Sequence, residues 1–245
     1  MTTRIAYVTG GMGRVGTAIC RRLAMRGMVV VAGCGPGSPR KNNWLREQRE
    51  EGFDFIASEG NASDWESAVA AFAKVRAQVG EIDVLVNNTG GNRDLLFRQM
   101  TPADWQAVLS GSLDSLFNVT RQVVDGMVER GWGRIINIGS VSARRGQVGQ
   151  VNFATAKAGM LGFTRALALE VAARGVTVNA VSPGLVGDAT EGPSPDVMDR
   201  LAASVPMRRL GRPDEVASAC AWLASEEAGY VTGIDHAVNG GLYMD

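Results

Sequence analysis

The chain has 245 residues, of which 45% are hydrophobic and 20% charged, and its formal net charge is zero. A neutral chain of this length suits one large α/β domain and gives no basis for binding nucleic acid or a membrane surface. Its three cysteines lie far apart and it has one histidine, so we expect no disulfide framework, no metal site and a reducing, cytoplasmic location. We also expect no signal peptide and no membrane span, because a strand-like "IAYVTG" begins at residue 5 and no long apolar run follows.

Short apolar runs rich in valine and isoleucine alternate with stretches of helical period. The predicted strands are residues 5–10, 28–33, 53–58, 83–88, 134–139 and 176–182, with an edge strand near 234–241. The runs are continuous rather than alternating, as is typical of strands buried on both faces, and residues 65–80 have the period of a helix. Because no linker or repeat interrupts this order, we predict a single Rossmann-type domain over residues 1–245. It is a doubly wound parallel sheet with helices on both faces.

The end of the first predicted strand carries a glycine pattern, in "VTGGMGRVGTAI" at residues 8–19. Glycines spaced as GxGxxG between a strand and a helix allow a pyrophosphate to approach the backbone and the helix N-terminus, although an ordinary glycine turn is the alternative. The residues expected to contact a dinucleotide here are Gly10, Gly13, Arg14, Val15 and Gly16.

The loop after the second predicted strand indicates which dinucleotide binds. This segment, "AGCGPGSPRK" at residues 32–41, has no acidic residue, whereas NAD-binding folds usually place one here for the ribose 2′-hydroxyl. Ser38, Arg40 and Lys41 are suited to a 2′-phosphate, so we expect NADP(H) as the cofactor. The alternative is a solvated basic loop.

Several motifs in order along the whole chain resemble those of the short-chain dehydrogenase/reductases. They are Thr9-Gly10, "VNNTGG" at 86–91, Ser140, Lys157 and "VSPG" at 181–184. More narrowly, "GFDFIASEGN" at 52–61 and "CAWLASEEAG" at 220–229 resemble segments of the acetoacetyl-CoA reductases of polyhydroxybutyrate synthesis. The resemblance implies an NADPH-dependent reductase of a 3-oxoacyl-CoA, and it agrees with a homotetramer. The helix expected over residues 154–173 is apolar on more than one face, which also indicates a second buried contact.

The resemblance also implies roles for individual positions. Adenine contacts fall on Gly60, Asn61 and Ala62, and contacts on the nicotinamide side fall on Asn88, Thr89, Gly90, Lys157, Pro183 and Gly184. Substrate contacts fall on Asp94, Ser140, Gln147, Gln150 and Leu185, although simple loop polarity explains Asp94 and the two glutamines equally well.

One catalytic position departs from the family. A tyrosine four residues before the lysine donates the proton in the family mechanism, and this chain has Phe153 before Lys157. Ser140 is retained, while Ser112 stands where a family asparagine helps to hold a water chain. A missing general acid typically costs about 10²–10⁴-fold in rate. Two hypotheses follow: a reductase with weakened activity, or a catalytically silenced NADP(H)-binding protein that acts as an oligomer partner or redox sensor.

Other departures accompany Phe153. Arg14 replaces a family glycine, where its side chain would crowd a pyrophosphate, clamp it, or point outward. Thr89 replaces a common alanine, and Leu185 replaces an aromatic residue. Changes at several positions favour natural divergence over a single engineered substitution. Among the tyrosines only Tyr243, contributed by a neighbouring subunit, is a conceivable substitute acid.

Overall fold

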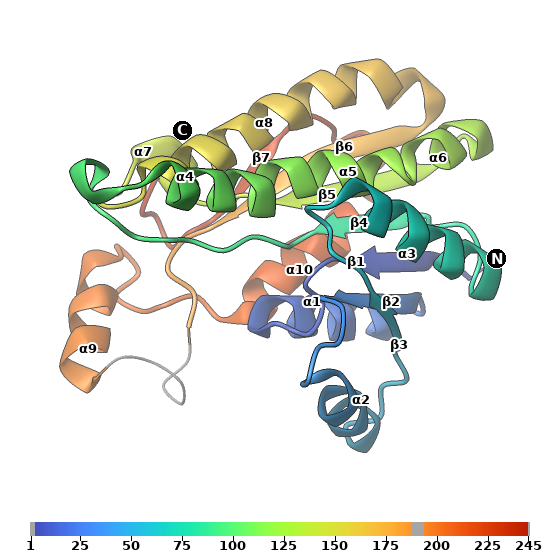
Figure 1. Ribbon diagram of the computed structural model, residues 1–245, viewed down its shortest axis with the longest axis horizontal. Helices are drawn as coiled ribbons and strands as arrows, with labels where there is room; N and C mark the ends of the chain where they lie inside the picture. Colours follow the sequence, from blue (N-terminus) through green and yellow to red (C-terminus); the bar gives the residue numbers. More distant parts are fainter. Residues whose placement is uncertain (1–2, 188–193, 245) are drawn as a thin grey trace.

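The computed structural model describes residues 3–187 and 194–244, and their strands form one parallel sheet (Figure 1). The strand order is β3-β2-β1-β4-β5-β6-β7, with every neighbouring pair parallel. The strands are β1 (Ile5–Val8), β2 (Val29–Cys34), β3 (Ile56–Glu59), β4 (Val84–Asn87), β5 (Gly133–Ile138), β6 (Val176–Pro183) and β7 (Asp235–Val238). The order reverses between β1 and β4, which is where ligands bind on such sheets. The predicted Rossmann-type α/β class is confirmed.

Helices cover both faces of this sheet. The α-helices are α1 (Arg14–Met25), α2 (Lys41–Glu50), α3 (Trp65–Gln78), α4 (Pro102–Leu109), α5 (Ser115–Arg121), α6 (Val124–Arg130), α7 (Ser142–Arg145), α8 (Val151–Val171), α9 (Pro195–Ser204) and α10 (Pro213–Leu223). Short helical segments are η1 (Phe97–Gln99), η2 (Ser110–Asp114) and η3 (Ala172–Arg174), of which η2 is a π-helix. Helices α1 and α10 pack on one face, and α3, α5, α6 and α8 supply buried side chains to the other.

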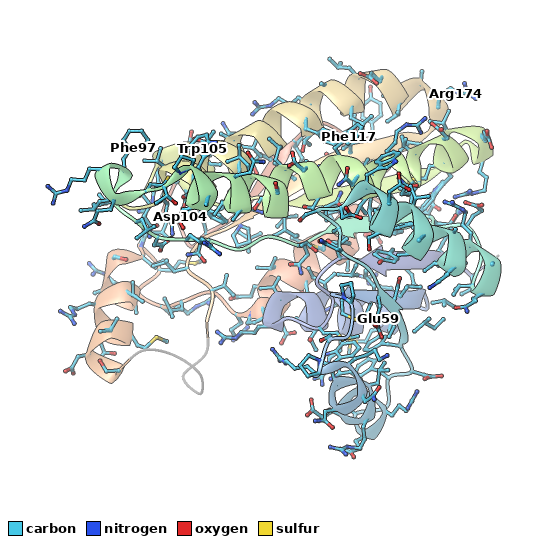
Figure 2. All side chains as sticks on the ribbon, in the orientation of Figure 1. Glu59, Phe97, Asp104, Trp105, Phe117 and Arg174 are labelled. Carbon is cyan, nitrogen blue, oxygen red and sulfur yellow. The ribbon has the colours of Figure 1, made fainter. Side chains whose placement is uncertain are left out.

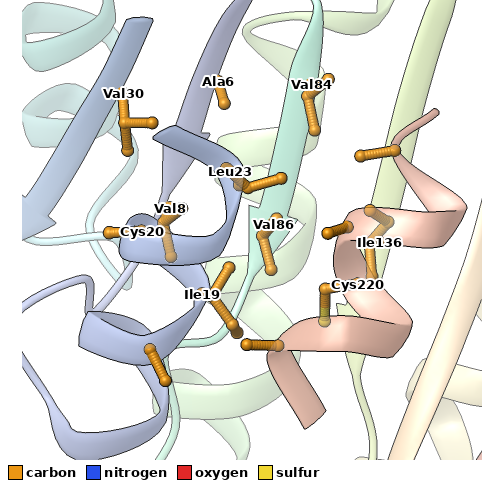
Figure 3. Close-up of a cluster of buried hydrophobic side chains, with 14 of the residues drawn as sticks. Ala6, Val8, Ile19, Cys20, Leu23, Val30, Val84, Val86, Ile136 and Cys220 are labelled. Atoms are coloured by element: carbon orange, nitrogen blue, oxygen red, sulfur yellow. The ribbon is translucent and has the colours of Figure 1, made fainter. Parts of the chain in front are cut away.

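The alternation of side chains along each strand builds two cores. On β1, Ala6 and Val8 belong to the core under α1 and α10, whereas Tyr7 belongs to the core on the opposite face. Ile19 of α1 and Cys220 of α10 meet the strands in the first core (Figure 3). Because both faces are covered, the strands need apolar residues at successive positions, which explains their continuous apolar sequence.

The third strand begins later than the expected 53–58. It starts at Ile56, which pairs with Val31 of β2. The rings of Phe53 and Phe55 stack with their centroids 5.6 Å apart, and Phe55 stacks on Trp44 of α2 at 5.3 Å. The apolar run therefore divides, with its first part anchoring α2 and only its second part entering the sheet.

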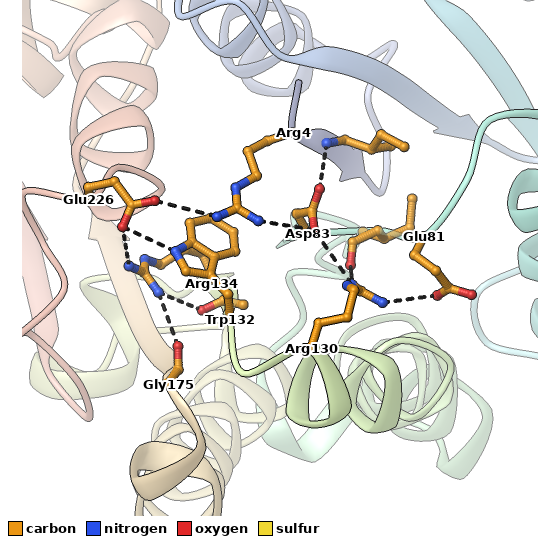
Figure 4. A network of polar contacts seen from close by, with 11 residues as sticks. Arg4, Glu81, Asp83, Arg130, Trp132, Arg134, Gly175 and Glu226 are labelled. Carbon is orange, nitrogen blue, oxygen red and sulfur yellow. Dashed lines mark hydrogen bonds and ion pairs between the residues drawn. The ribbon is translucent and has the colours of Figure 1, made fainter. Parts of the chain in front are cut away.

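A polar network closes the edge of the sheet where the strands begin (Figure 4). The Trp132 ring has the guanidinium carbon of Arg4 at 3.7 Å from its centroid and that of Arg134 at 4.3 Å. Glu226 accepts a hydrogen bond from Trp132 Nε1 at 3.1 Å and forms ion pairs with both arginines. This network ties β1, β5 and the chain after α10 together, and it leaves the opposite edge for the candidate site.

Candidate active site

The glycine turn between β1 and α1 is shaped by close backbone contacts. Gly10 has φ +58°, and a Cβ on Gly16 would lie 2.2 Å from the Gly10 carbonyl oxygen. Gly13 N donates to the same oxygen at 3.1 Å, and α1 then begins without a side-chain cap. The first N–H groups of α1 therefore have no side-chain acceptor and face the C-terminal edge of the sheet, where a pyrophosphate binds well. This cradle, which a side chain at Gly16 would fill, fits a dinucleotide.

The two other residues expected at the turn point in different directions. Val15 is half-buried and packs against the core under α1. Arg14 is exposed, and its Nη1 lies 3.9 Å from the Cβ position of Gly187. The guanidinium thus reaches the chain that leaves β6.

Thr9 joins the ends of β1 and β4. Its Oγ1 accepts hydrogen bonds from Asn88 N at 2.8 Å and from Thr89 N at 2.9 Å. The Asn88 side-chain amide donates back to the carbonyl oxygens of Thr9 and Gly10, both at 3.1 Å. The sequence motif included Thr9 without giving it a role; in the structure it holds the two predicted cofactor segments at a fixed separation.

A pocket opens beside the hydrogen bonds of Thr9, at the ends of β1, β2 and β3. It includes five residues expected at the cofactor, namely Gly10, Gly60, Asn61, Ala62 and Thr89, together with Tyr7, Cys34 and Pro36, which the sequence analysis did not single out. Burial raises the pKa of Tyr7 to about 12, and its hydroxyl donates to Ser58 Oγ at 3.2 Å. The sequence signal that could have indicated Tyr7 is Gly33, because a Cβ there would lie 2.9 Å from the Tyr7 hydroxyl and only glycine leaves room for that side chain. The pocket has the position of an adenosine site in this fold.

The loop after β2 carries the cations expected at a 2′-phosphate, but an acid reaches it from the next strand. Arg40 is exposed and Ser38 half-buried. Lys41 Nζ forms a short ion pair with Glu59 at the end of β3, and Gly37 N donates to the other Glu59 oxygen at 2.9 Å. The hydrogen bond and charge of Lys41 lower the pKa of Glu59, which is therefore an anion at neutral pH.

Lys157 is buried at the centre of the candidate site. Its Nζ donates to the Ile138 carbonyl oxygen at 2.6 Å, and burial lowers its pKa to about 8. The same Nζ lies 5.6 Å from the centroid of the Phe153 ring, which precedes it by one turn of α8. Ser140 follows β5 and is half-buried, with its Oγ accepting from Ser142 N at 3.1 Å.

Ser112 lies beside Lys157, in the π-helical segment η2. A Cβ on Gly90 would lie 2.9 Å from Ser112 Oγ and 3.5 Å from Lys157 Nζ, so both side chains border this glycine. Ser112 is 1% exposed, and among the described residues its Oγ has no hydrogen-bond partner. A buried hydroxyl without a partner is expected to bind a water molecule or a ligand group. π-Helical turns often occur at functional sites.

The residues expected at the substrate are partly engaged with each other. Gln150 is buried, donates to Asp94 at 3.1 Å and accepts from Ser142 Oγ at 2.9 Å. Gln147 is exposed. The Gln150 amide thus has partners that join the loop after β4 to the start of α8, while Gln147 remains available at the surface.

The segment after β6 contributes backbone rather than side chains. Val141 N donates to the Pro183 oxygen at 2.9 Å, and a Cβ on Gly184 would lie 2.8 Å from Asn239 Cα. These contacts bring the end of β6 to the start of the Ser140 loop. Leu185 instead lines a hollow with Val205 and Met207, away from the adenosine pocket.

None of the tyrosines contacts Ser140 or Lys157 within the described residues. Tyr7 forms part of the adenosine pocket, Tyr230 is fully exposed, and the Tyr243 ring lies 5.8 Å from the Arg144 guanidinium carbon.

A glycine-turn dinucleotide cradle beside a buried lysine and a half-buried serine defines a nicotinamide-dependent oxidoreductase. The family profile described as enoyl-(acyl carrier protein) reductase matches residues 12–243. The chain therefore belongs to this family of short-chain dehydrogenase/reductases.

Relatives match along the full length. The acetoacetyl-CoA reductase of Cupriavidus necator is 61% identical over 100% of both chains. The nodulation protein G of Azospirillum brasilense is 52% identical over 99% of both, and the 3-oxoacyl-(acyl-carrier-protein) reductase of Escherichia coli is 41% identical over 98% of both. In residues 3–187 and 194–244 no helix is long and apolar enough to cross a membrane.

Proposed function

We propose that this protein is an NADPH-dependent acetoacetyl-CoA reductase that forms 3-hydroxybutyryl-CoA in the cytoplasm, as a step of polyhydroxybutyrate synthesis. The observation that carries the proposal is the joint placement of Lys157, Ser140 and the β4 end at the carboxyl edge of a full-length reductase fold. The identity to the Cupriavidus necator enzyme supports the choice of substrate. The whole chain would act as one domain.

Each described residue has a distinct part in this proposal. The nicotinamide, when bound, supplies the hydride. Ser140 is half-buried, and its Oγ would hold the substrate oxygen. Lys157 would bind the nicotinamide ribose through the donors that Ile138 leaves free, while its charge stabilises developing negative charge on the substrate. Phe153 fills the acid position without a transferable proton, so proton delivery falls to water or to the lysine itself, at a reduced rate.

The proposal includes a homotetramer. Phe117 of α5, labelled in Figure 2, and Leu169 of α8 are 52% and 85% exposed. A hollow among α5, α6 and α8 is lined by Val124, Phe163 and Leu167 among others. An apolar surface of this kind is suited to a two-fold interface. Sedimentation of the protein at micromolar concentration tests this, and a monomer would contradict it.

The experiment that tests the function is an assay of NADPH oxidation with acetoacetyl-CoA on the unmodified protein. We expect slow but measurable turnover that requires the substrate. NADPH binding without any turnover would favour the alternative of a silenced cofactor-binding protein.

A further inference from the structure

The adenosine end of the cofactor site contains an acid that the sequence of the second-strand loop does not show. Glu59 is the last residue of β3 and pairs in register with Cys34, the last residue of β2. It therefore lies beside the loop of residues 35–40, next to Gly60 and Asn61 of the adenosine pocket. Figure 2 labels Glu59, which lies above α2 in the orientation of Figure 1.

Glu59 engages two donors of that loop at once. One carboxylate oxygen binds Lys41 Nζ and the other accepts from Gly37 N at 2.9 Å. The two side chains of the ion pair are 31% and 36% exposed, so the pair is near the surface and accessible to a ligand. Gly37 has φ +62°, a conformation that favours glycine, and its N–H points at Glu59 rather than at the pocket.

The contact changes the charge that a 2′-phosphate would meet. Of the three residues suited to this phosphate, Lys41 stays charged but its charge is compensated by Glu59. Only Arg40 and Ser38 remain without this carboxylate as a partner. A 2′-phosphate carries between one and two negative charges at neutral pH, and Glu59 adds a like charge close by. NAD(H) has a ribose 2′-hydroxyl in place of the phosphate, and a neighbouring carboxylate can accept a hydrogen bond from it without charge repulsion.

We propose that Glu59 is a specificity-determining residue that limits the preference for NADP(H) over NAD(H), by holding Lys41 and by repelling the 2′-phosphate. This inference rests on the proposed NADP(H)-dependent function and deepens it. It differs from a purely structural role for Glu59, in which loss of the carboxylate would weaken both cofactors alike.

Glu59→Gln is the variant that separates these roles. The glutamine oxygen still accepts from Gly37 N, while the charge is lost and Lys41 is freed. We expect NADPH to bind about 2- to 5-fold more tightly, the size expected for exposed charges, and NADH affinity to stay nearly unchanged. Lys41→Gln leaves the carboxylate without its cation, so NADPH should bind more weakly and NADH nearly as before.

Dissociation constants for NADPH and NADH are measured by calorimetry, which requires no turnover. Glu51→Gln is the matched control, because it removes the charge of an exposed glutamate at the C-terminal end of α2. It should leave the ratio of the two dissociation constants unchanged. Parallel weakening of both cofactors in Glu59→Gln, or no change in the ratio, would overturn the proposal. If the unmodified protein binds both cofactors equally, the NADP(H) assignment fails, and the shift in Glu59→Gln still decides the role of Glu59.

Discussion

Lys157 and Phe153 lie one turn apart on α8, with the lysine nitrogen 5.6 Å from the centre of the phenyl ring. The pair preserves the geometry in which a lysine assists a phenol, but it has no phenol. The Phe153 side chain is half-buried, so the ring already occupies the space that a tyrosine would need.

Phe153→Tyr should therefore raise acetoacetyl-CoA reductase activity. The change adds one hydroxyl to an existing ring, so overpacking is slight, and the charge of Lys157 lowers the phenol pKa. We expect kcat to rise on the order of 10²-fold or more, the usual worth of a general acid. Steady-state NADPH oxidation measures it, with Phe153→Leu as the control that adds no hydroxyl.

Two results would contradict this prediction. High activity in the unmodified protein would mean that water or another group donates the proton efficiently. No gain in the tyrosine variant, with NADPH still bound, would mean that the changes at Arg14, Ser112 or Leu185 have already disabled the site.

The buried lysine makes stability depend on pH. The folded pKa of Lys157 is about 8, and an unfolded lysine titrates near 10.4, so between these values the unfolded chain binds more protons. The contribution of Lys157 to the free energy of unfolding should therefore rise with pH through this window, while below about pH 8 both states are protonated and the full cost of burial remains. The buried thiols of Cys20 and Cys220, whose pKa burial raises, contribute with the opposite sign, so the lysine part is obtained by difference from a variant. Urea titrations across the window measure the slope.

Lys157→Met should remove that rise, because methionine does not titrate. The comparison is of slopes rather than of absolute stability, since the variant also leaves the Ile138 oxygen without its donor. An unchanged slope in Lys157→Met would assign the pH dependence to other groups.

Two glycines of the cofactor turn should respond differently to the same change. A Cβ on Gly16 meets the Gly10 oxygen at 2.2 Å, so Gly16→Ala must displace the turn. A Cβ on Gly13 lies 3.4 Å from that oxygen, an ordinary contact. We expect Gly16→Ala to weaken NADPH binding about tenfold or more, and Gly13→Ala much less. Fluorescence titration measures the NADPH dissociation constant of each variant. Equal weakening in Gly16→Ala and Gly13→Ala would mean that the pyrophosphate does not bind at this turn.

Arg40 should carry the interaction with the 2′-phosphate. Arg40→Ala is expected to weaken NADPH binding about tenfold, as the loss of a charge-assisted hydrogen bond implies, and to spare NADH. Arg46→Ala, an exposed position on α2, the helix that begins directly after Arg40, is the matched control. Unchanged NADPH affinity in Arg40→Ala would refute the assignment.

Much of the fold and part of the site follow from patterns that are local in the chain. The Val- and Ile-rich runs determine strands buried on both faces, and their alternation with helices determines a parallel sheet, because each pattern depends on residues near one another in sequence. The four-residue spacing of Phe153 and Lys157 places them on one helix face for the same reason. The glycine turn is equally local, since its conformation needs residues without side chains.

Other features depend on which segments meet in space. Glu59 at the end of β3 reaches Lys41 at the start of α2, and Asp94 binds Gln150 across 56 positions of the chain. The run from Phe53 to Ser58 divides between a helix anchor and a strand because Trp44 offers an aromatic surface to Phe55, which in turn stacks on Phe53. Whether a charge or an amide faces a ligand or another side chain is decided by the packing of the loops at the carboxyl edge of the sheet. The spacing of residues along the chain does not contain that information, because the competing partners are brought together only when the strands pair.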